Sequence, residues 1–141
     1  MPVWSDIMQT ALIIALSLHV LSSVFWAGSS FTLARTGGLG GEKLLFPQIG
    51  AATVAIVTGA TLWRLVHEGS FGLSEQILAG GAIAALAAIA VQIIVGGGAV
   101  RQLCSSTGDT SAARSRLAIA QRIAAGLLAV TALCMGAARY A

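Results

Sequence analysis

The first apolar run of the chain, residues 11–27, reads ALIIALSLHVLSSVFWA and carries one ionisable side chain, His19, near its middle. An ionisable residue this deep in an apolar helix is rare, and such residues usually face the protein interior and mark functional sites. Spacings of four and three put four side chains on one face of the helix: Ala15, His19, Ser22 and Trp26. The other faces carry mostly Ile, Leu and Val, which suit lipid. We therefore expect His19 to pack against other helices.

The composition is that of an integral membrane protein. Of the 141 residues, 57% are hydrophobic and 9% are charged, and the mean hydropathy is +0.88. Four stretches are long enough to cross a hydrocarbon core, which takes about 20 residues. They cover residues 7–29, 44–66, 76–100 and 117–138. Because the connections are short, the sequence predicts an all-α fold with a single domain, residues 1–141, built as an antiparallel bundle of four transmembrane helices.

The basic residues are distributed asymmetrically. Most of them fall in or beside the first and third connections: Arg35, Lys43, Arg101, Arg114, Arg116 and Arg122. Cytoplasmic loops are enriched in Lys and Arg, so these connections are expected inside and both termini outside. The predicted location is a bacterial inner (plasma) membrane, with the lipid bilayer as the first partner. The basic excess is a topology signal and predicts no nucleic-acid partner.

Small residues recur on one face of the second and third stretches, where they let neighbouring helices approach closely. These positions are Ala51, Ala55, Gly59, Gly81, Ala85, Ala88 and Gly96. Gln92 shares the face in the third helix, so it is expected to point inward, to another helix or to a ligand. Pro47 is expected in the first turn of the second helix. Gly96–Gly98 are expected to end the third.

Residues 18–28, LHVLSSVFWAG, resemble the first helix of the copper-resistance D (CopD)-like membrane proteins and of the related HemJ-type protoporphyrinogen oxidases. Both families have a His followed seven residues later by Trp and then a Gly, here His19, Trp26 and Gly28. The oxidases also have an Arg near the place of Arg35. The resemblance implies a four-helix membrane domain in which His19 binds the metal or haem and the other three residues support it.

Two polar positions that are usual in both families differ here. Both families usually have a Lys near the start of the third helix, and the corresponding place in this chain is near Glu75. They also have an acidic residue in the fourth helix, and the polar residue nearest to that place here is Gln121. The oxidase activity depends on that Lys. The sequence therefore ranks copper handling slightly ahead of haem chemistry.

His19 is the main candidate ligand for either cofactor, copper or haem b. Neutral imidazole binds both iron and copper, and a small-residue interior leaves room for a flat haem or a small ion. Trp26, Arg35 and Gln92 complete the predicted cofactor-binding set. The alternative is an ordinary buried histidine whose ring is hydrogen-bonded to Ser22, Ser23 or Gln92.

Soft ligands in the predicted outer half suggest a copper site. Thioether and thiolate groups select copper(I), and Met8, Cys134 and Met135 would continue a path from the outside to His19. Met and Cys also serve as apolar filling, which is the alternative for these three. Arg35, Arg101 and Arg122 are candidates to bind haem propionates, or else lipid phosphates, at the cytoplasmic side.

The second histidine, His67, lies at the outer end of the second helix. His19 is about 20 Å below the outer surface at 1.5 Å per residue, so the two rings are not expected to share a metal. A separate acidic patch around His67 would comprise Asp6, Glu68 and Glu75. It is either a weak divalent-cation site or a solvated rim.

Three functions remain open from the sequence. The first is a CopD-like protein that binds copper or transfers it across the membrane at His19. The second is a b-haem redox protein similar to the HemJ type, with a quinone or a partner protein as electron acceptor. The third is a non-catalytic subunit of a larger membrane complex, or of a homo-oligomer. Whether the chain is an enzyme is left open by its sequence.

Overall fold

The computed structural model describes residues 2–66, 69, 72–105 and 107–141, with side chains from Asp6 onward. All regular structure in these residues is helical. The elements are α1 (Pro2–Arg35), α2 (Gly41–Val66), α3 (Leu73–Val91), the π-helical segment η1 (Gln92–Gly96), α4 (Gly97–Ser105) and α5 (Ser111–Ala138). The predicted all-α fold is confirmed.

Four helices of the described chain are long and apolar enough to cross a membrane. They cover Asp6–Arg35, Gly41–Val66, Leu73–Ser105 and Ser111–Ala138. Each contains one of the four predicted stretches and extends beyond it at one end or both. The third is the continuous run α3–η1–α4, and its 33 residues make it about 50 Å long at 1.5 Å per residue.

The third helix does not end at Gly96–Gly98, as the glycine run had suggested. Gly96 is buried, and a Cβ built on it would lie 3.5 Å from Leu45 Cδ1 and 3.7 Å from Leu117 Cδ1. Close packing by α2 and α5 thus holds this backbone in helical form. Such contacts between helices are not visible in the sequence of one helix. The π turn η1 lies at this point, and α4 carries the helix on to Ser105.

The turn between α1 and α2 depends on glycine. Gly37, Gly38 and Gly40 have φ values of 66°, 81° and 79°, in the left-handed region that other residues rarely adopt. A Cβ on Gly38 would also lie 3.2 Å from the Arg114 carbonyl oxygen of α5. The reversal is complete by residue 40, so α2 begins earlier than expected and Pro47 lies in its second turn rather than its first.

The start of α5 is fixed by a side chain in the preceding loop. Asp109 Oδ1 accepts a hydrogen bond from the Ser111 backbone N–H at 2.9 Å, and Oδ2 accepts one from Ser111 Oγ at 3.0 Å. Hydrogen bonds to the charged carboxylate favour ionisation, so they hold the pKa of Asp109 below its ordinary value. This contact is therefore fully present at neutral pH and is lost only in acid.

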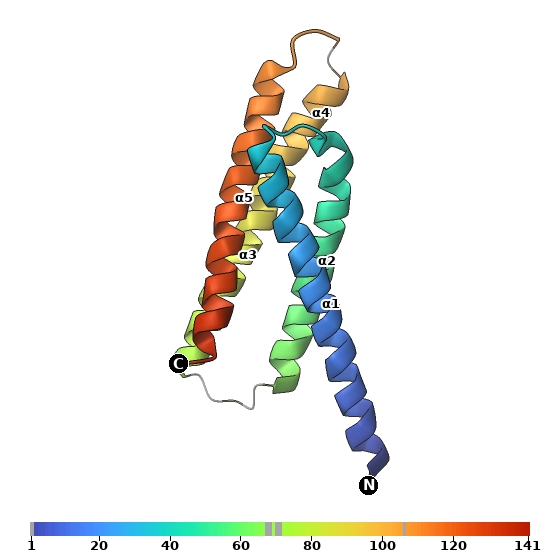
Figure 1. Cartoon of the computed structure of the whole chain (residues 1–141), viewed down its shortest axis with the longest axis vertical. Coiled ribbons are helices and arrows are strands. Elements are labelled where there is room, and N and C mark those ends of the chain that lie inside the picture. Colours follow the sequence, from blue (N-terminus) through green and yellow to red (C-terminus); the bar gives the residue numbers. More distant parts are fainter. Residues whose placement is uncertain (1, 67–68, 70–71, 106) are drawn as a thin grey trace.

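The helices associate as two pairs, α1 with α2 and α3 with α5, and α1 also contacts α5. Figure 1 shows both termini at one end of the molecule, where the two pairs diverge. Toward the opposite end the pairs come together. The α1–α2 turn and α4 lie in that part (Figure 1). This divergence positions the site described below.

The α3–α5 contact is made by small residues. A Cβ on Gly81 would lie 2.9 Å from Cys134 Cβ and 3.4 Å from the Thr131 carbonyl oxygen, so the two backbones approach closely. Thr131 Oγ1 lies 3.0 Å from both the Gly81 and the Leu127 carbonyl oxygens. Buried alanines continue the contact along both helices: Ala84, Ala88, Ala120 and Ala124.

Gly81→Ala is expected to destabilise the fold, because its new methyl group collides with Cys134 Cβ, which cannot rotate away. Overpacking of this kind costs about 1–3 kcal/mol. The matched control is Gly80→Ala on the same helix, where a Cβ meets nothing within 4 Å. Thermal loss of helical circular dichroism in detergent measures the difference, and equal melting of the two variants would contradict the close approach.

Candidate functional site

A cavity of about 920 Å³ lies between the two helix pairs. It is lined by the middle of α1 and of α3 and by the C-terminal halves of α2 and α5, so it lies in the half of the molecule that carries both termini. Its walls are mostly apolar, as in Leu16, Ile56, Ala85 and Leu128. An apolar cavity with few polar groups is the usual form of a site for a small organic ligand or cofactor.

The cavity is open along part of its side. Several lining residues of α1 and α3 are also more than half exposed: Ile13 (58%), Leu16 (53%), Val24 (65%) and Leu86 (52%). The cavity is therefore not fully enclosed by the helices.

Among the residues that the structure describes, His19 provides the imidazole of the cavity wall. Its Nδ1 lies 2.8 Å from the Ala55 carbonyl oxygen and 3.3 Å from Thr58 Oγ1. A carbonyl oxygen only accepts hydrogen bonds, so in the neutral ring Nδ1 carries the proton and Nε2 keeps the lone pair. Among the described residues, no hydrogen bond engages Nε2. The ring is thus oriented by α2 and retains one free nitrogen that can bind a metal.

Gln92 lies next to the closed end of the cavity. Its Oε1 accepts a hydrogen bond from Trp26 Nε1 at 2.7 Å, and the same indole lines the cavity. Its Nε2 donates to Ser30 Oγ at 2.9 Å and to Gln121 Oε1 at 3.0 Å. The predicted inward direction of Gln92 is confirmed, and its side chain is fully buried.

Two further glutamines extend this network to all four long helices. Gln121 Nε2 of α5 donates to Gln48 Oε1 of α2 at 3.0 Å, and Gln48 Nε2 donates to Ser29 Oγ of α1 at 3.1 Å. Gln48, Gln92 and Gln121, which we call the glutamine cluster, have no exposed surface. Burying an amide without a partner is costly, so these mutual hydrogen bonds fix which residues of the four helices face each other.

The glutamine cluster and its surroundings close the other half of the molecule. On the cavity side it borders a group of buried residues, Trp26, Ala52, Ala55, Ala88, Ala124 and Leu128. A second buried group lies toward the α1–α2 turn: Leu45, Ala99, Val100 and Leu117. The cavity lining contains none of the three glutamines, so the cavity ends at this packed region.

The structure brings three of the predicted site residues to the cavity wall, namely His19, Trp26 and Met135. Gln92 is linked to the cavity through Trp26. Cys134 packs against Gly81 in the α3–α5 contact and is not among the lining residues. The imidazole and one thioether are thus the predicted soft or borderline ligands that share this space.

The other predicted site residues lie elsewhere. Met8 is 52% exposed, near the N-terminus of α1. The Arg35 guanidinium lies 5.9 Å from the centre of the Phe31 ring. Arg35 is nine residues after Trp26, which is about 14 Å along the helix. Arg122 Nε donates to the Ala34 carbonyl oxygen at 3.4 Å. Arginines at this end are therefore remote from the cavity.

His67 and Glu68 of the predicted outer patch lie outside the described residues. Within the described part of the chain, no group of three or more His, Cys, Asp or Glu side chains could hold a metal ion. Within the described residues, a metal at His19 would accordingly depend on other ligand types or on a cofactor that brings its own donors.

The sequence did not predict that Ser30, Gln48 and Gln121 join Gln92. A signal was present, because Gln48, Gln92 and Gln121 lie within the second, third and fourth apolar stretches, and a carboxamide has a strong hydrogen-bonding capacity. Amides inside three apolar helices, with an indole and serines in the first, are a pattern that favours a shared network. Which amide meets which depends on the register between helices.

No protein-family model, curated protein or solved structure matches this chain.

Gln92→Leu is expected to destabilise the fold by about 1–3 kcal/mol, because the buried Trp26 N–H loses its acceptor. The side-chain oxygen of Gln121 also loses its closer donor and keeps only the contact with Gln48 Nε2 at 3.5 Å. Gln76→Leu is the matched control on α3, where the side chain is exposed. Unfolding by SDS, followed by circular dichroism, compares the two variants with the unchanged protein. Equal midpoints for Gln92→Leu and Gln76→Leu would show that the network adds no stability.

Proposed function

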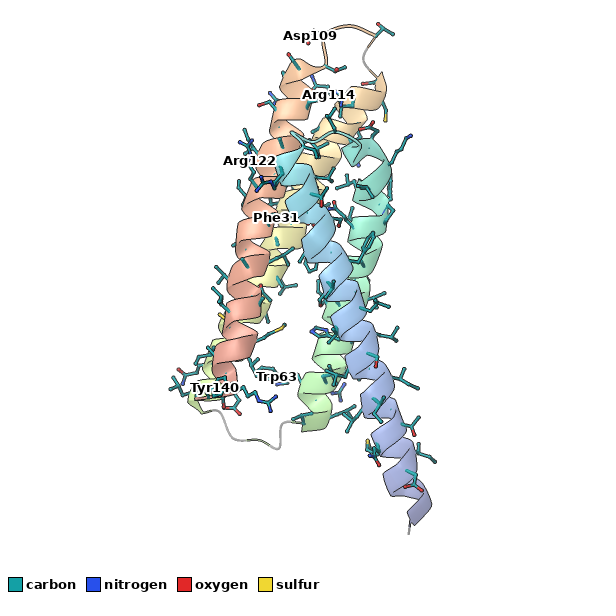
Figure 2. All side chains as sticks on the ribbon, in the orientation of Figure 1. Phe31, Trp63, Asp109, Arg114, Arg122 and Tyr140 are labelled. Atoms are coloured by element: carbon teal, nitrogen blue, oxygen red, sulfur yellow. The ribbon has the colours of Figure 1, made fainter. Side chains whose placement is uncertain are left out.

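We propose that this chain is a multi-pass protein of a bacterial inner membrane, an antiparallel bundle of four spanning helices with both termini outside. The four long apolar helices support insertion. Arg114 and Arg122 lie toward the end opposite the termini, and Trp63 and Tyr140 lie at the end that carries them (Figure 2). Basic residues favour the cytoplasmic side, and aromatic residues favour the membrane interface.

Within that bundle, we propose that the cavity binds haem b and that His19 is its axial ligand through Nε2. The observation that carries this proposal is the 2.8 Å hydrogen bond from Nδ1 to the Ala55 carbonyl oxygen, beside an apolar cavity of about 920 Å³. A metal-binding His commonly donates its other N–H to a backbone carbonyl, which orients the ring. Apolar walls suit the body of the macrocycle.

The residues of this chain would bind the group, orient it and exclude water. His19 would supply the axial nitrogen, and the indoles of Trp26 and Trp63, which line the cavity, would contact the apolar ring. Arg64 follows Trp63 directly and is a candidate partner for propionates at that end. When bound, the haem would supply one-electron redox chemistry, with a quinone or a partner protein as acceptor.

Copper handling of the CopD-like kind is the second candidate. It is favoured by Met135, whose thioether lines the same cavity as His19, because soft sulfur ligands select copper(I). The sequence alone ranked this function first. The cavity favours haem instead, since it is far larger than an ion needs and has few donor atoms. The resemblance of residues 18–28 to both families is compatible with either cofactor.

An absorption spectrum of the detergent-purified protein, oxidised and then dithionite-reduced, tests the haem proposal. We expect a Soret band that shifts on reduction with resolved α and β bands. His19→Ala is expected to remove these bands, because it deletes the axial nitrogen. The matched control is His67→Ala, the other histidine of the sequence, which is expected to leave them unchanged.

Iron and copper are quantified on the same samples, and hemin is added to protein purified without it. Copper in place of haem, lost in His19→Ala, would replace the first proposal by the second. A protein that carries neither metal and takes up no hemin would contradict both, and the role of a non-catalytic subunit in a larger membrane complex would then be pursued.

A further inference from the structure

We infer that Gly59 is a positioning residue for His19 and that Thr58 helps to decide which imidazole nitrogen is free. Both residues belong to α2, whereas His19 belongs to α1. The inference rests on the proposed function only for the identity of the ligand. The orientation and tautomer of the ring are properties of the chain alone and are measured without any cofactor.

Gly59 provides the space in which the ring lies. A Cβ built on Gly59 would be 3.0 Å from His19 Cε1, 3.3 Å from Nδ1 and 4.0 Å from Nε2. The edge of the ring that carries Nδ1 therefore packs on the bare backbone of α2. Ala55 lies one helical turn earlier on the same face, and its carbonyl oxygen accepts the hydrogen bond from Nδ1–H, with 2.8 Å between nitrogen and oxygen.

A side chain at position 59 would separate these two groups. A carbon–carbon approach of 3.0 Å is shorter than the ordinary contact of about 3.5–4.0 Å, so a methyl group would push the ring off the α2 backbone. The hydrogen bond to Ala55 would lengthen or break. Nδ1 would then no longer be constrained to carry the proton.

Thr58 reinforces the same tautomer. Its Oγ1 lies 2.6 Å from the Val54 carbonyl oxygen and 3.2 Å from that of Ala55, so its hydroxyl proton is already used within α2. Toward His19 Nδ1, at 3.3 Å, the hydroxyl oxygen can only accept. Two acceptors and no donor thus face Nδ1. Because the neutral ring has one N–H, the lone pair is kept on Nε2.

The test uses ¹⁵N-histidine-labelled full-length protein without cofactor, in detergent, with His67→Gln so that His19 gives the only imidazole signals. Two-bond ¹H–¹⁵N correlation spectra distinguish a protonated ring nitrogen from one with a lone pair. We expect Nδ1 to be protonated and Nε2 to be unprotonated. The opposite assignment would overturn the inference even if no further variant folds.

Gly59→Ala, in the same background, is expected to give both tautomers in exchange. Gly50→Ala is the matched control on α2, because a Cβ there meets nothing within 4 Å. It is expected to keep the single tautomer, with circular dichroism confirming equal helix content. An unchanged, single Nδ1–H tautomer in a folded Gly59→Ala protein would overturn the positioning role.

Hemin titration of Gly59→Ala and Gly50→Ala, in protein that keeps His67, then connects the inference to the proposed function. Loss of a group that orients a metal ligand typically weakens binding about 10–100-fold, and we expect a loss of that size for Gly59→Ala alone. If the tautomers behave as expected but the unchanged protein binds no hemin, the haem proposal fails and the positioning inference stands. Equal hemin affinity of the two variants would contradict the importance of Gly59 for binding.

Discussion

The arrangement of the four long helices depends on hydrogen bonds among buried carboxamides. Gln121 is the central residue, since it accepts from Gln92 of η1 and donates to Gln48 of α2. Each of these amides lies away from water in an otherwise apolar surrounding, where an unpaired polar group is strongly unfavourable. Sliding any one helix by a residue would separate the partners. Apolar packing alone does not select one relative position between helices that are apolar on every side. The hydrogen bonds of the glutamine cluster do select one such register.

This junction divides the molecule into two parts with different properties. Around the glutamines the helices are closely packed, with Ala, Leu and Val filling the remaining space. Toward the end that carries both termini the α1–α2 and α3–α5 pairs diverge (Figure 1). The cavity lies between them, and His19 is part of its wall. The closely packed part thus provides a fixed base for the part that contains the cavity. Trp26 belongs to both parts, because its indole lines the cavity and donates a hydrogen bond to Gln92.

Much of this could be predicted from the sequence, because the signals lie within single helices. Hydropathy located the four apolar helices, and helical spacing placed Trp26, Gln92 and Gly81 on inward faces. Relations between helices could not be predicted in this way. The helix continued through Gly96 because Leu45 and Leu117 pack on it. Met8, Cys134 and Arg35 shared a predicted site with His19 on grounds of chemistry, but the helix pairing places them apart from the cavity wall. Gly59 was expected only to ease helix packing, and its contact with the imidazole follows from how α1 crosses α2.

The flank of the cavity bordered by Ile13, Leu16 and Leu86 has a consequence for how a ligand reaches His19. In the proposed membrane-spanning arrangement, these exposed side chains of the cavity would face acyl chains. The concentration that governs occupancy is then the concentration dissolved in the lipid, which for an apolar molecule exceeds its aqueous concentration by its partition coefficient. Arrival takes place by diffusion within the plane of the membrane. A site of modest intrinsic affinity would then remain filled.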